Sequence, residues 1–152
     1  MDNNIENNVT DLFTWVASVE PQEEWRPVVG FDGLYEVSDQ GRVRNRRGRV
    51  LKSFRASKGA GRVEPEHAKV HLHDEEGNVL RKKVHVLVLE AFVGARPEGM
   101  LGLHRNDDKD NNTLENLYWG TPWENRQDAR RNGVYARAAE ARAERRWRLM
   151  AA

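Results

Sequence analysis

The pattern that most constrains the fold of this chain lies in residues 100–133, which predict a strand, a polar loop, a second strand and a helix in that order. The helix start is well marked, because Thr121 can cap it, Pro122 suits its first position and Glu124 completes a capping box. Gly133 follows the helical pattern and is typical of a helix end. We therefore expect a hairpin that leans against a capped helix.

The remaining periodicities predict short elements of both kinds, so the expected fold class is α+β. A β-rich region is expected before the hairpin and helix, and a polar helix after them. The predicted helices are residues 4–19, 84–92 and 136–152. The predicted strands are residues 34–38, 42–45, 50–54, 69–73 and 79–86, and the last of these overlaps the start of the helix predicted at residues 84–92. Residues 57–67 are predicted to form a loop.

Length and composition indicate a small soluble domain. A chain of 152 residues can bury one modest core, or form two small units that share one. Hydrophobic residues make up 38% and charged residues 32%, a balance that argues against a disordered chain. No apolar run approaches the roughly 18 residues of a membrane span, so no membrane partner is expected. The acidic N-terminus lacks the basic flank and apolar segment of an export signal, which predicts a cytoplasmic protein.

The counts of cysteine and histidine limit the metal chemistry. The chain has no cysteine, which excludes a disulfide and a thiolate zinc site. Its five histidines form no tight cluster along the sequence, so an all-histidine zinc site is not expected. Any metal is predicted to have oxygen ligands and at most one imidazole.

Charge is segregated along the chain although the net charge is only +1. Residues 1–24 carry six acids and no base, whereas residues 41–63 carry nine bases and no acid. A basic stripe interleaved with apolar residues indicates a polyanionic partner such as nucleic acid, the alternative being a solvated charged face. Strand alternation is expected to place Arg42, Arg44 and Arg46 on one face. The residues predicted to contact DNA phosphates are Arg42, Arg44, Arg46, Arg47, Arg49 and Lys52.

Three polar residues are predicted to meet at one groove. His104 ends the first strand of the hairpin, Asn116 opens the second, and Asn125 lies one turn into the helix. A neutral imidazole can take a proton from water, and a divalent ion can neutralise charge on a phosphate, which together indicate phosphodiester hydrolysis. We expect His104 to be the general base, and the carbonyl oxygen of Asn125 to bind a hard cation such as Mg²⁺. Asn116 is expected to brace the loop and to orient His104.

Structural interpretations of these residues remain open. His104 could be an ordinary structural histidine, and His85 is expected to be a hydrogen-bonding residue at the start of a buried helix. The acids Asp107, Asp108 and Asp110 suggest a calcium loop, but the glycine and the glutamate of an EF-hand are missing, which favours turn formers. Three tryptophans are predicted to pack in or against the core: Trp25, Trp119 and Trp123.

Three segments resemble, in order, the parts of one known family. HRNDDKDNNTLENLYWGTPWEN is similar to the HNH endonuclease motif of phage and intron-encoded homing enzymes, in the variant whose middle His is Asn. EEWRPVVGFDGLYEVSDQGRVRN resembles the small NUMOD-like DNA-binding motif that often precedes these nucleases, and KKVHVLVLEAFVG resembles the connecting segment. The resemblance covers residues 23–133, and the order of its parts is more specific than any single motif.

The resemblance implies a small N-terminal β-rich DNA-binding region, a ββα-metal (His-Me finger) nuclease motif and a C-terminal helix. It implies a DNA endonuclease of a phage or another mobile element, which hydrolyses phosphodiester bonds in double-stranded DNA within a bacterial host cell. The expected cofactor is one divalent ion, Mg²⁺ or Mn²⁺, with no small-molecule cofactor, and the expected state is a monomer or homodimer. The implied boundaries are residues 1–22 for an N-terminal arm, 23–60 for the DNA-binding motif, 61–135 for the nuclease region and 136–152 for a basic helix.

By position, the resemblance implies that His104 is the general base, Asn116 the positioning residue and Asn125 a metal ligand. The sequence departs from the family at one place. The residue before the His is commonly Asp, Asn or His and supplies another metal ligand, whereas here it is Leu103. The cation would then be held by Asn125, by Asp128 one turn later on the same face, and by phosphate and water.

Two other functions are compatible with the same sequence. One is a DNA-binding protein that keeps the HNH scaffold without catalysis, and the other is an interaction module of a phage assembly that docks through its C-terminal helix. Metal-dependent cleavage of plasmid DNA that requires His104 separates the nuclease from both.

Overall fold

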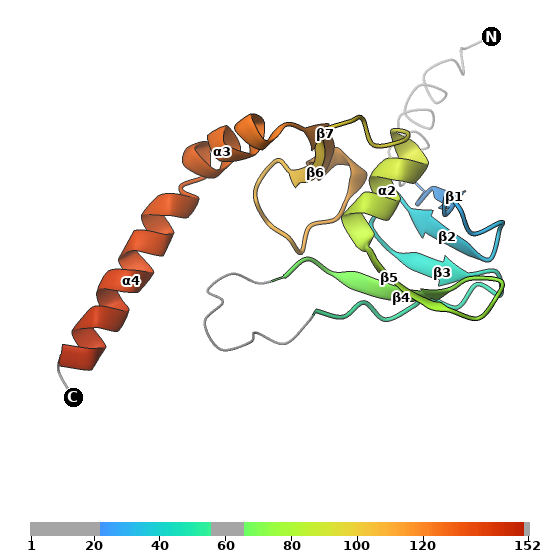
Figure 1. The fold of residues 1–152 in the computed structure, drawn as a ribbon, viewed down its shortest axis with the longest axis horizontal. Helices are drawn as coiled ribbons and strands as arrows, with labels where there is room; N and C mark the ends of the chain where they lie inside the picture. Colours follow the sequence, from blue (N-terminus) through green and yellow to red (C-terminus); the bar gives the residue numbers. More distant parts are fainter. Residues whose placement is uncertain (1–21, 56–65, 151–152) are drawn as a thin grey trace, which may run out of the picture.

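The fold is a mixed α+β arrangement of short antiparallel sheets around one central helix (Figure 1). The structure is a computed structural model that describes residues 22–55 and 66–150, so the helix predicted at residues 4–19 and most of the loop predicted at 57–67 lie outside the described residues. The strands are β1 (Trp25–Pro27), β2 (Tyr35–Ser38), β3 (Val43–Asn45), β4 (Lys69–His73), β5 (Val79–Lys83), β6 (Leu101–His104) and β7 (Leu117–Gly120). The helices are α2 (Val84–Phe92), the 3₁₀ turn η1 (Leu114–Asn116), α3 (Pro122–Arg131) and α4 (Val134–Met150).

Part of the basic stripe, Val43–Asn45, forms strand β3 of a three-stranded sheet of order β1-β2-β3, and a strand is predicted there from the sequence. We call this three-stranded sheet the basic sheet. The further strand predicted at residues 50–54 is wrong. Val50 forms an isolated bridge with Arg44 of β3, whereas Phe54 pairs with Lys69 of β4. Because the two ends of this segment pair with different sheets, it crosses between them and forms no continuous ladder of its own.

The hairpin β4–β5 leads directly into α2. Its register pairs Lys69 with Lys83, and the helix begins at the next residue, Val84. Residues 84–86, included in the predicted strand, are therefore helical. The buried residues Val84, Leu87 and Val88 follow the i, i+3, i+4 spacing of one helix face, and burial of that face explains why the helix starts here.

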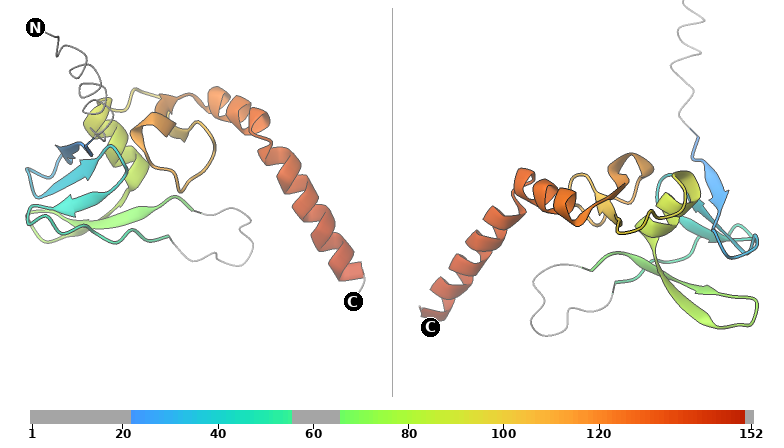
Figure 2. Two further views of the ribbon diagram at one scale, coloured as in Figure 1. Left: turned by 180° about the vertical axis from the view of Figure 1, so that it is seen from behind. Right: turned by 45° about the horizontal axis from the view of Figure 1, so that its top comes forward.

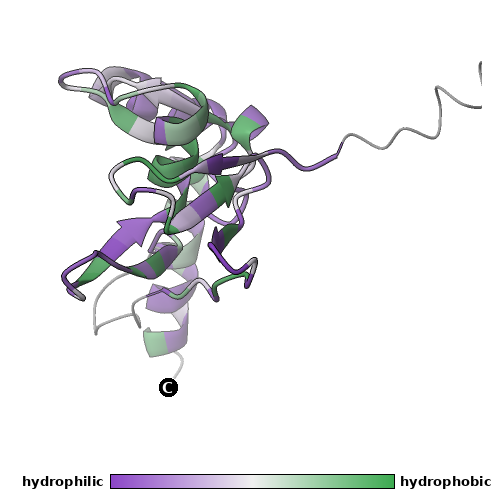
Figure 3. Ribbon diagram, turned by 90° about the vertical axis from the view of Figure 1, so that its right-hand side faces the viewer, coloured by the Kyte–Doolittle hydropathy of each residue, from purple (hydrophilic) through white to green (hydrophobic). Residues whose placement is uncertain are grey.

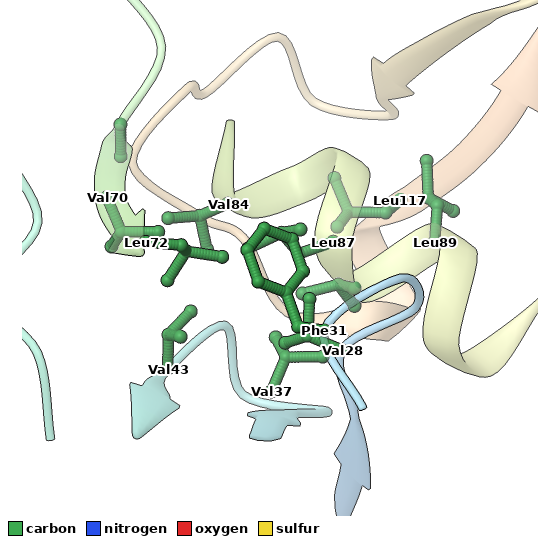
Figure 4. Close-up of a cluster of buried hydrophobic side chains, with 12 residues drawn as sticks. Val28, Phe31, Val37, Val43, Val70, Leu72, Val84, Leu87, Leu89 and Leu117 are labelled. Atoms are coloured by element: carbon green, nitrogen blue, oxygen red, sulfur yellow. The ribbon is translucent and has the colours of Figure 1, made fainter. Parts of the chain in front are cut away.

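Helix α2 lies at the centre of the hydrophobic core and contacts β1, β2, β5, β6, β7 and η1 (Figure 1). Figure 4 shows side chains from the β1–β3 sheet, the β4–β5 hairpin, α2 and β7 meeting in a single cluster. Burying one such Leu or Val side chain stabilises a fold by roughly 1.5–3 kcal/mol. The core therefore holds the β6–β7 hairpin and the β1–β3 sheet against the same helix. Its fully buried members are Val28, Val37, Val43, Val70, Leu72, Val84, Leu87, Val88 and Leu89.

The hairpin β6–β7 and helix α3 form as the sequence predicts. The Thr121 hydroxyl accepts a hydrogen bond from the Glu124 backbone N–H at 3.2 Å, and the Glu124 carboxylate accepts one from the Thr121 N–H at 2.7 Å, so the capping box is complete. Gly133 follows the helix with a φ of +68°, which an L-residue with a side chain rarely adopts. The predicted helix end is confirmed.

The predicted C-terminal helix is confirmed as α4, which contacts α3 and points away from the sheets (Figure 2). It has no buried residue, and charged and apolar residues alternate along it in Figure 3. Trp123 at the start of α3 is 60% exposed, so its predicted packing role is wrong, whereas Trp25 and Trp119 are half-buried. Within the described residues, no helix combines the length and apolar character needed to cross a membrane.

The turn between β2 and β3 contacts the loop between β6 and β7. The Asp39 carbonyl accepts a hydrogen bond from the Leu114 N–H at 2.7 Å, and Arg55 forms an ion pair with Asp110. Gly41 packs so closely that a Cβ placed on it would lie 2.7 Å from both the Cβ and the carbonyl oxygen of Asn112. The basic sheet therefore supports the loop that follows His104.

We predict that Gly41→Ala destabilises the fold more than Gly48→Ala. Both glycines have positive φ values, +76° and +80°, but a Cβ on Gly48 would meet nothing within 4 Å. The backbone conformation alone should cost about 1–2 kcal/mol in each variant, and the clash with Asn112 should add about 1–3 kcal/mol in Gly41→Ala. Urea denaturation measures both free energies of unfolding, and equal losses would mean that the loop moves aside freely.

Candidate active site

His104 lies at the point where strand β6 enters the polar loop. It is 5% exposed, and it pairs across the hairpin with Leu117, the residue after Asn116. The Asn116 carbonyl accepts a hydrogen bond from the Arg105 N–H at 2.8 Å. The hairpin therefore brings the backbones of residues 104 and 116 close together, as the sequence predicts.

His104 and Asn125 line one cavity of about 380 Å³ between the β6–β7 hairpin, the N-terminal part of α2, and helices α3 and α4. Three cationic side chains also line this cavity, which gives it a charge suited to a phosphate. Its polar lining includes His67, His85, His104, Asp107, Asn125, Lys83, Arg96 and Lys109.

Asn112 determines which nitrogen of His104 carries the proton. The Asn112 amide nitrogen donates to two backbone carbonyls, those of Lys109 at 3.3 Å and Asp110 at 3.1 Å. Its oxygen must therefore be the atom that faces His104 Nε2 at 3.2 Å, and that nitrogen must donate. In the neutral ring Nδ1 is then left with a free electron pair, as a general base requires.

Burial lowers the pKa of His104 below its ordinary value of 6.5. The hydrogen bond to Asn112 and the charges of Asp108 and Asp107 raise it in part, and the charge of Lys109 lowers it. Because burial is the largest cause, the ring is neutral at pH 7 and able to accept a proton.

Three histidines that are distant in sequence form a cluster at this cavity. The ring centroids of His67 and His85 lie 4.5 Å apart, those of His85 and His104 lie 5.0 Å apart, and those of His67 and His104 lie 5.6 Å apart. Burial lowers the pKa of His67 to about 4 and that of His85 to about 3, so all three rings are uncharged at pH 7. This cluster was not predicted, because no local sequence pattern links residue 67 to residue 104.

The histidine cluster does not form a closed metal site. In the part of the chain that the structure describes, no group of three or more His, Asp or Glu side chains is arranged to hold a metal ion. The three histidines are nevertheless close in space, although they are dispersed along the sequence. His85 was expected to form hydrogen bonds, but its buried Nδ1 has no hydrogen-bond partner among the described residues.

Asn116 braces the loop from within and does not line the cavity. Its amide nitrogen donates to the Asn111 carbonyl at 2.8 Å, and its oxygen accepts from the Asn106 N–H at 3.3 Å. The ring of His104 is instead contacted by Asn112, a residue that was not selected from the sequence. A signal for it was present, because Asn112 belongs to the Asn-Asn pair of the HNH-like segment.

Asp128 does not lie at the cavity with Asn125. It is 6% exposed and lines a separate groove with Arg105 and Tyr118. Its carboxylate accepts hydrogen bonds from the Tyr118 hydroxyl and, at 2.6 Å, from Arg131. Burial and the bond to Asp128 raise the pKa of Tyr118. The predicted metal ligand instead packs the helix against the hairpin, because Tyr118 of β7 and Arg131 hold its carboxylate.

Leu103 presents an apolar side chain to the same cavity as His104. It is 6% exposed, and its Cδ1 would lie 2.7 Å from a Cβ placed on Gly120. The side chain is thus packed against β7 and offers no donor to a cation. The side chains that line the cavity include the carboxamide of Asn125 and the carboxylate of Asp107, whose oxygen atoms suit a hard divalent ion.

The predicted DNA-binding residues fall into two groups. Arg42 and Arg44 both stack over Trp25, at 5.6 Å and 4.1 Å from the ring centroid, which confirms that they share a face. Both are ion-paired, Arg42 with Glu23 and Arg44 with Glu36 at 2.6 Å. The other four are exposed, and no salt bridge joins them to another described residue: Arg46, Arg47, Arg49 and Lys52.

Two segments of the chain match known families. Residues 23–63 match the NUMOD4 motif, and residues 82–127 match the HNH endonuclease family. The chain is 31% identical over 99 residues to the DNA endonuclease I-HmuI of Bacillus phage SP01, and the overlap takes in 64% of this chain and 52% of that protein. The chain therefore spans about half the length of the curated relative that it matches.

A solved structure described as "DNA binding and cleavage by the HNH homing endonuclease I-HmuI" is also similar to this chain. The TM-score is 0.61 at 30% sequence identity, over 72% of this chain and 59% of that one. The similarity extends beyond the hairpin and helix, since 72% of the chain exceeds the length of either matched segment.

We predict that Asn112→Asp raises the pKa of His104. The substitution keeps an oxygen acceptor near Nε2, but it places a negative charge within hydrogen-bond distance of the ring, which favours the protonated imidazole. The rise should be about one pH unit or more. NMR titration of the His104 ring protons measures it, with the ring of His73, outside the cavity, as the internal control. An unchanged His104 titration would show that residue 112 does not contact the ring in solution.

Proposed function

We propose that this chain, which carries an HNH endonuclease region behind a NUMOD4 motif, hydrolyses phosphodiester bonds in double-stranded DNA. The observation that carries this proposal is the neutral imidazole of His104, oriented by Asn112 and lining one cavity with Asn125 and three cations. Such an arrangement can hold a phosphate and deprotonate water beside it.

The side chains have separable roles in the proposed reaction. Lys83, Arg96 and Lys109 attract the phosphate and stabilise the charge that develops on it. His104 takes a proton from water at Nδ1 while the water oxygen bonds to phosphorus, and the bond from phosphorus to the leaving oxygen breaks. The leaving oxygen then takes a proton from solvent. Asn112 keeps the His104 ring in the required tautomer, and Asn116 keeps the loop closed beneath it.

HNH endonucleases generally use a divalent metal ion. We propose Mg²⁺ or Mn²⁺ for this chain, with Asn125 among its ligands, because the donors that line the cavity include oxygen atoms of the kind that hard cations prefer. When bound, such an ion neutralises charge on the scissile phosphate and stabilises the leaving oxygen.

DNA is proposed to bind along the basic sheet and to extend to the cavity. Arg46, Arg47 and Arg49 are exposed and can contact backbone phosphates, which position the duplex without reading its sequence. Arg42 and Arg44, which are paired with acids, can exchange these partners for phosphate when DNA arrives. Support for this path comes from the contact of the β2–β3 turn with the loop that follows His104.

The setting proposed for this activity is a bacterial cell infected by a phage or carrying another mobile element. Support comes from the relative in Bacillus phage SP01 and from the similar structure described as a homing endonuclease. The chain is proposed to act in the cytoplasm, where the DNA of the host and of the phage is accessible. Its proposed state is a monomer or homodimer.

A catalytically inactive DNA-binding protein is the second candidate. Leu103 favours it, because this residue brings no ligand to the cavity where the family commonly has one. A supercoiled plasmid distinguishes the two functions, since the nuclease converts it to open-circular or linear DNA and the binding protein only retards it.

We predict that wild-type protein nicks or linearises supercoiled plasmid with Mg²⁺ or Mn²⁺ and not with EDTA, and that His104→Ala slows this at least about a hundredfold. The loss is expected because no other group then takes the proton from water. His73→Ala is the matched control, since this exposed histidine lies outside the cavity, and it should keep the wild-type rate. Equal rates for wild type and His104→Ala would exclude His104 as the base, and DNA retention without any cleavage would favour the binding protein.

We also predict that Arg47→Ala combined with Arg49→Ala weakens DNA binding and its salt dependence. Each lost phosphate contact should reduce the slope of log K against log salt by about 0.9, so the double variant should lose about 1.8. Arg26→Ala is the control, because Arg26 is paired with Glu24 at 2.7 Å and stacks over Phe92, outside the predicted contact set. Fluorescence anisotropy with a labelled duplex gives both slopes, and a double variant that keeps the wild-type slope would place DNA elsewhere.

A further inference from the structure

We infer that the carboxylate of Asp107 binds the divalent cation together with Asn125, and so supplies the oxygen ligand that Leu103 cannot provide. This inference rests on the proposed nuclease function and names the residues that hold its cofactor. Asp107 lies in the loop after β6, three residues beyond His104, and it is half-buried at the same cavity as His104 and Asn125.

The backbone of Asp107 is fixed relative to His104. Its N–H donates a hydrogen bond to the His104 carbonyl at 3.1 Å, which closes a tight turn directly after the base. Its φ is +57°, a conformation that Asp and Asn tolerate better than other residues with a side chain. The turn therefore presents a carboxylate to the cavity.

The carboxylate is also held from helix α3, the helix that carries Asn125. The Asn132 amide nitrogen donates to Asp107 Oδ2 at 2.8 Å and to the Arg105 carbonyl at 2.8 Å. Asn132 is the C-terminal cap of α3, so both proposed ligands are anchored to one helix. One carboxylate oxygen is thereby oriented, and within the described residues no hydrogen bond or ion pair engages the other, Oδ1.

Neighbouring acids in the loop do not share this position. Asp108 accepts the Asp110 N–H at 2.9 Å, and Asp110 forms an ion pair with Arg55. Neither residue lines the cavity, and among the described residues that do line it Asp107 is the one with a carboxylate. The chemistry of the cation therefore points to Asp107 specifically.

One carboxylate and one carboxamide form an open site. Mg²⁺ is commonly bound through one or two carboxylates, with water and substrate phosphate completing its coordination. A site with two protein ligands is compatible with the finding that, among the described residues, no group of three or more His, Asp or Glu side chains is arranged to hold a metal ion. The site would then bind the ion weakly without DNA and more tightly when phosphate arrives.

The experiment uses Mn²⁺ as a paramagnetic probe of the full chain without DNA. Histidine ring protons within a few ångström of bound Mn²⁺ broaden at low ion concentrations, and the five histidines are distinct reporters. In the wild type we expect the signals of His104 to broaden before those of His71 and His73, which do not line the cavity. In Asp107→Asn the same broadening should need at least about tenfold more Mn²⁺, because the charged ligand is lost while the amide can keep the turn and its bond to Asn132. Asp108→Asn, a matched change of charge one residue away, should resemble the wild type.

Wild-type broadening in Asp107→Asn, an equal loss in Asp108→Asn, or a wild type without selective broadening of His104 would each overturn the inference. Plasmid nicking by the same proteins separates this result from the proposed function. If the wild type does not cleave but its Mn²⁺ broadening depends on Asp107, the cation site stands and the nuclease proposal fails. If the wild type and Asp107→Asn cleave equally and broaden equally, the nuclease stands and the role of Asp107 fails.

Discussion

The hydrogen bonding of the polar loop between β6 and β7 is the constraint on which the candidate site depends. A loop rich in carboxamides could adopt many conformations, but here Asn112 and Asn116 each bond to backbone groups of the same loop. The carboxamide side chains thus satisfy loop backbone groups that strand pairing would satisfy in a β-sheet. They also leave the Asn112 oxygen facing His104. The imidazole is thus oriented by side chains whose own positions are fixed.

The loop is supported in turn by the basic sheet. Gly41 lies against Asn112, and Asp39 bonds to Leu114, so the turn that joins β2 and β3 contacts the segment that orients His104. Because both regions also pack on α2, the surface proposed to bind DNA and the cavity proposed to cut it have one common support. A DNA duplex that displaced the β2–β3 turn would also shift Asn112, because Gly41 in this turn packs directly against it.

Features coded by neighbouring residues were predictable from the sequence, whereas features formed by distant residues were not. The capping box at Thr121, the stop at Gly133 and the hairpins depend on spacings of a few residues, and the structure has them where expected. The cluster of His67, His85 and His104 joins three elements through the tertiary fold, and no local spacing encodes it. The placement of Asp128 failed for a related reason. Asp128 does lie on α3 as predicted, but its carboxylate accepts a hydrogen bond from the Tyr118 hydroxyl on a different element, β7.

In the proposed reaction, the charges around the cavity link the protonation state of His104 to the binding of substrate. Burial keeps His104 neutral in the free protein, and the charge of Lys109 acts in the same direction. The cations that lower the pKa of the histidine cluster include Lys83 and Lys109, and both line the space where a phosphate would lie. A phosphate diester that enters this space brings a negative charge, which offsets these cations and must raise the pKa of His104. In the proposed reaction the ring therefore becomes a stronger base as the phosphate binds. Lys109, which lines the same cavity, acts together with burial to keep the ring unprotonated until then.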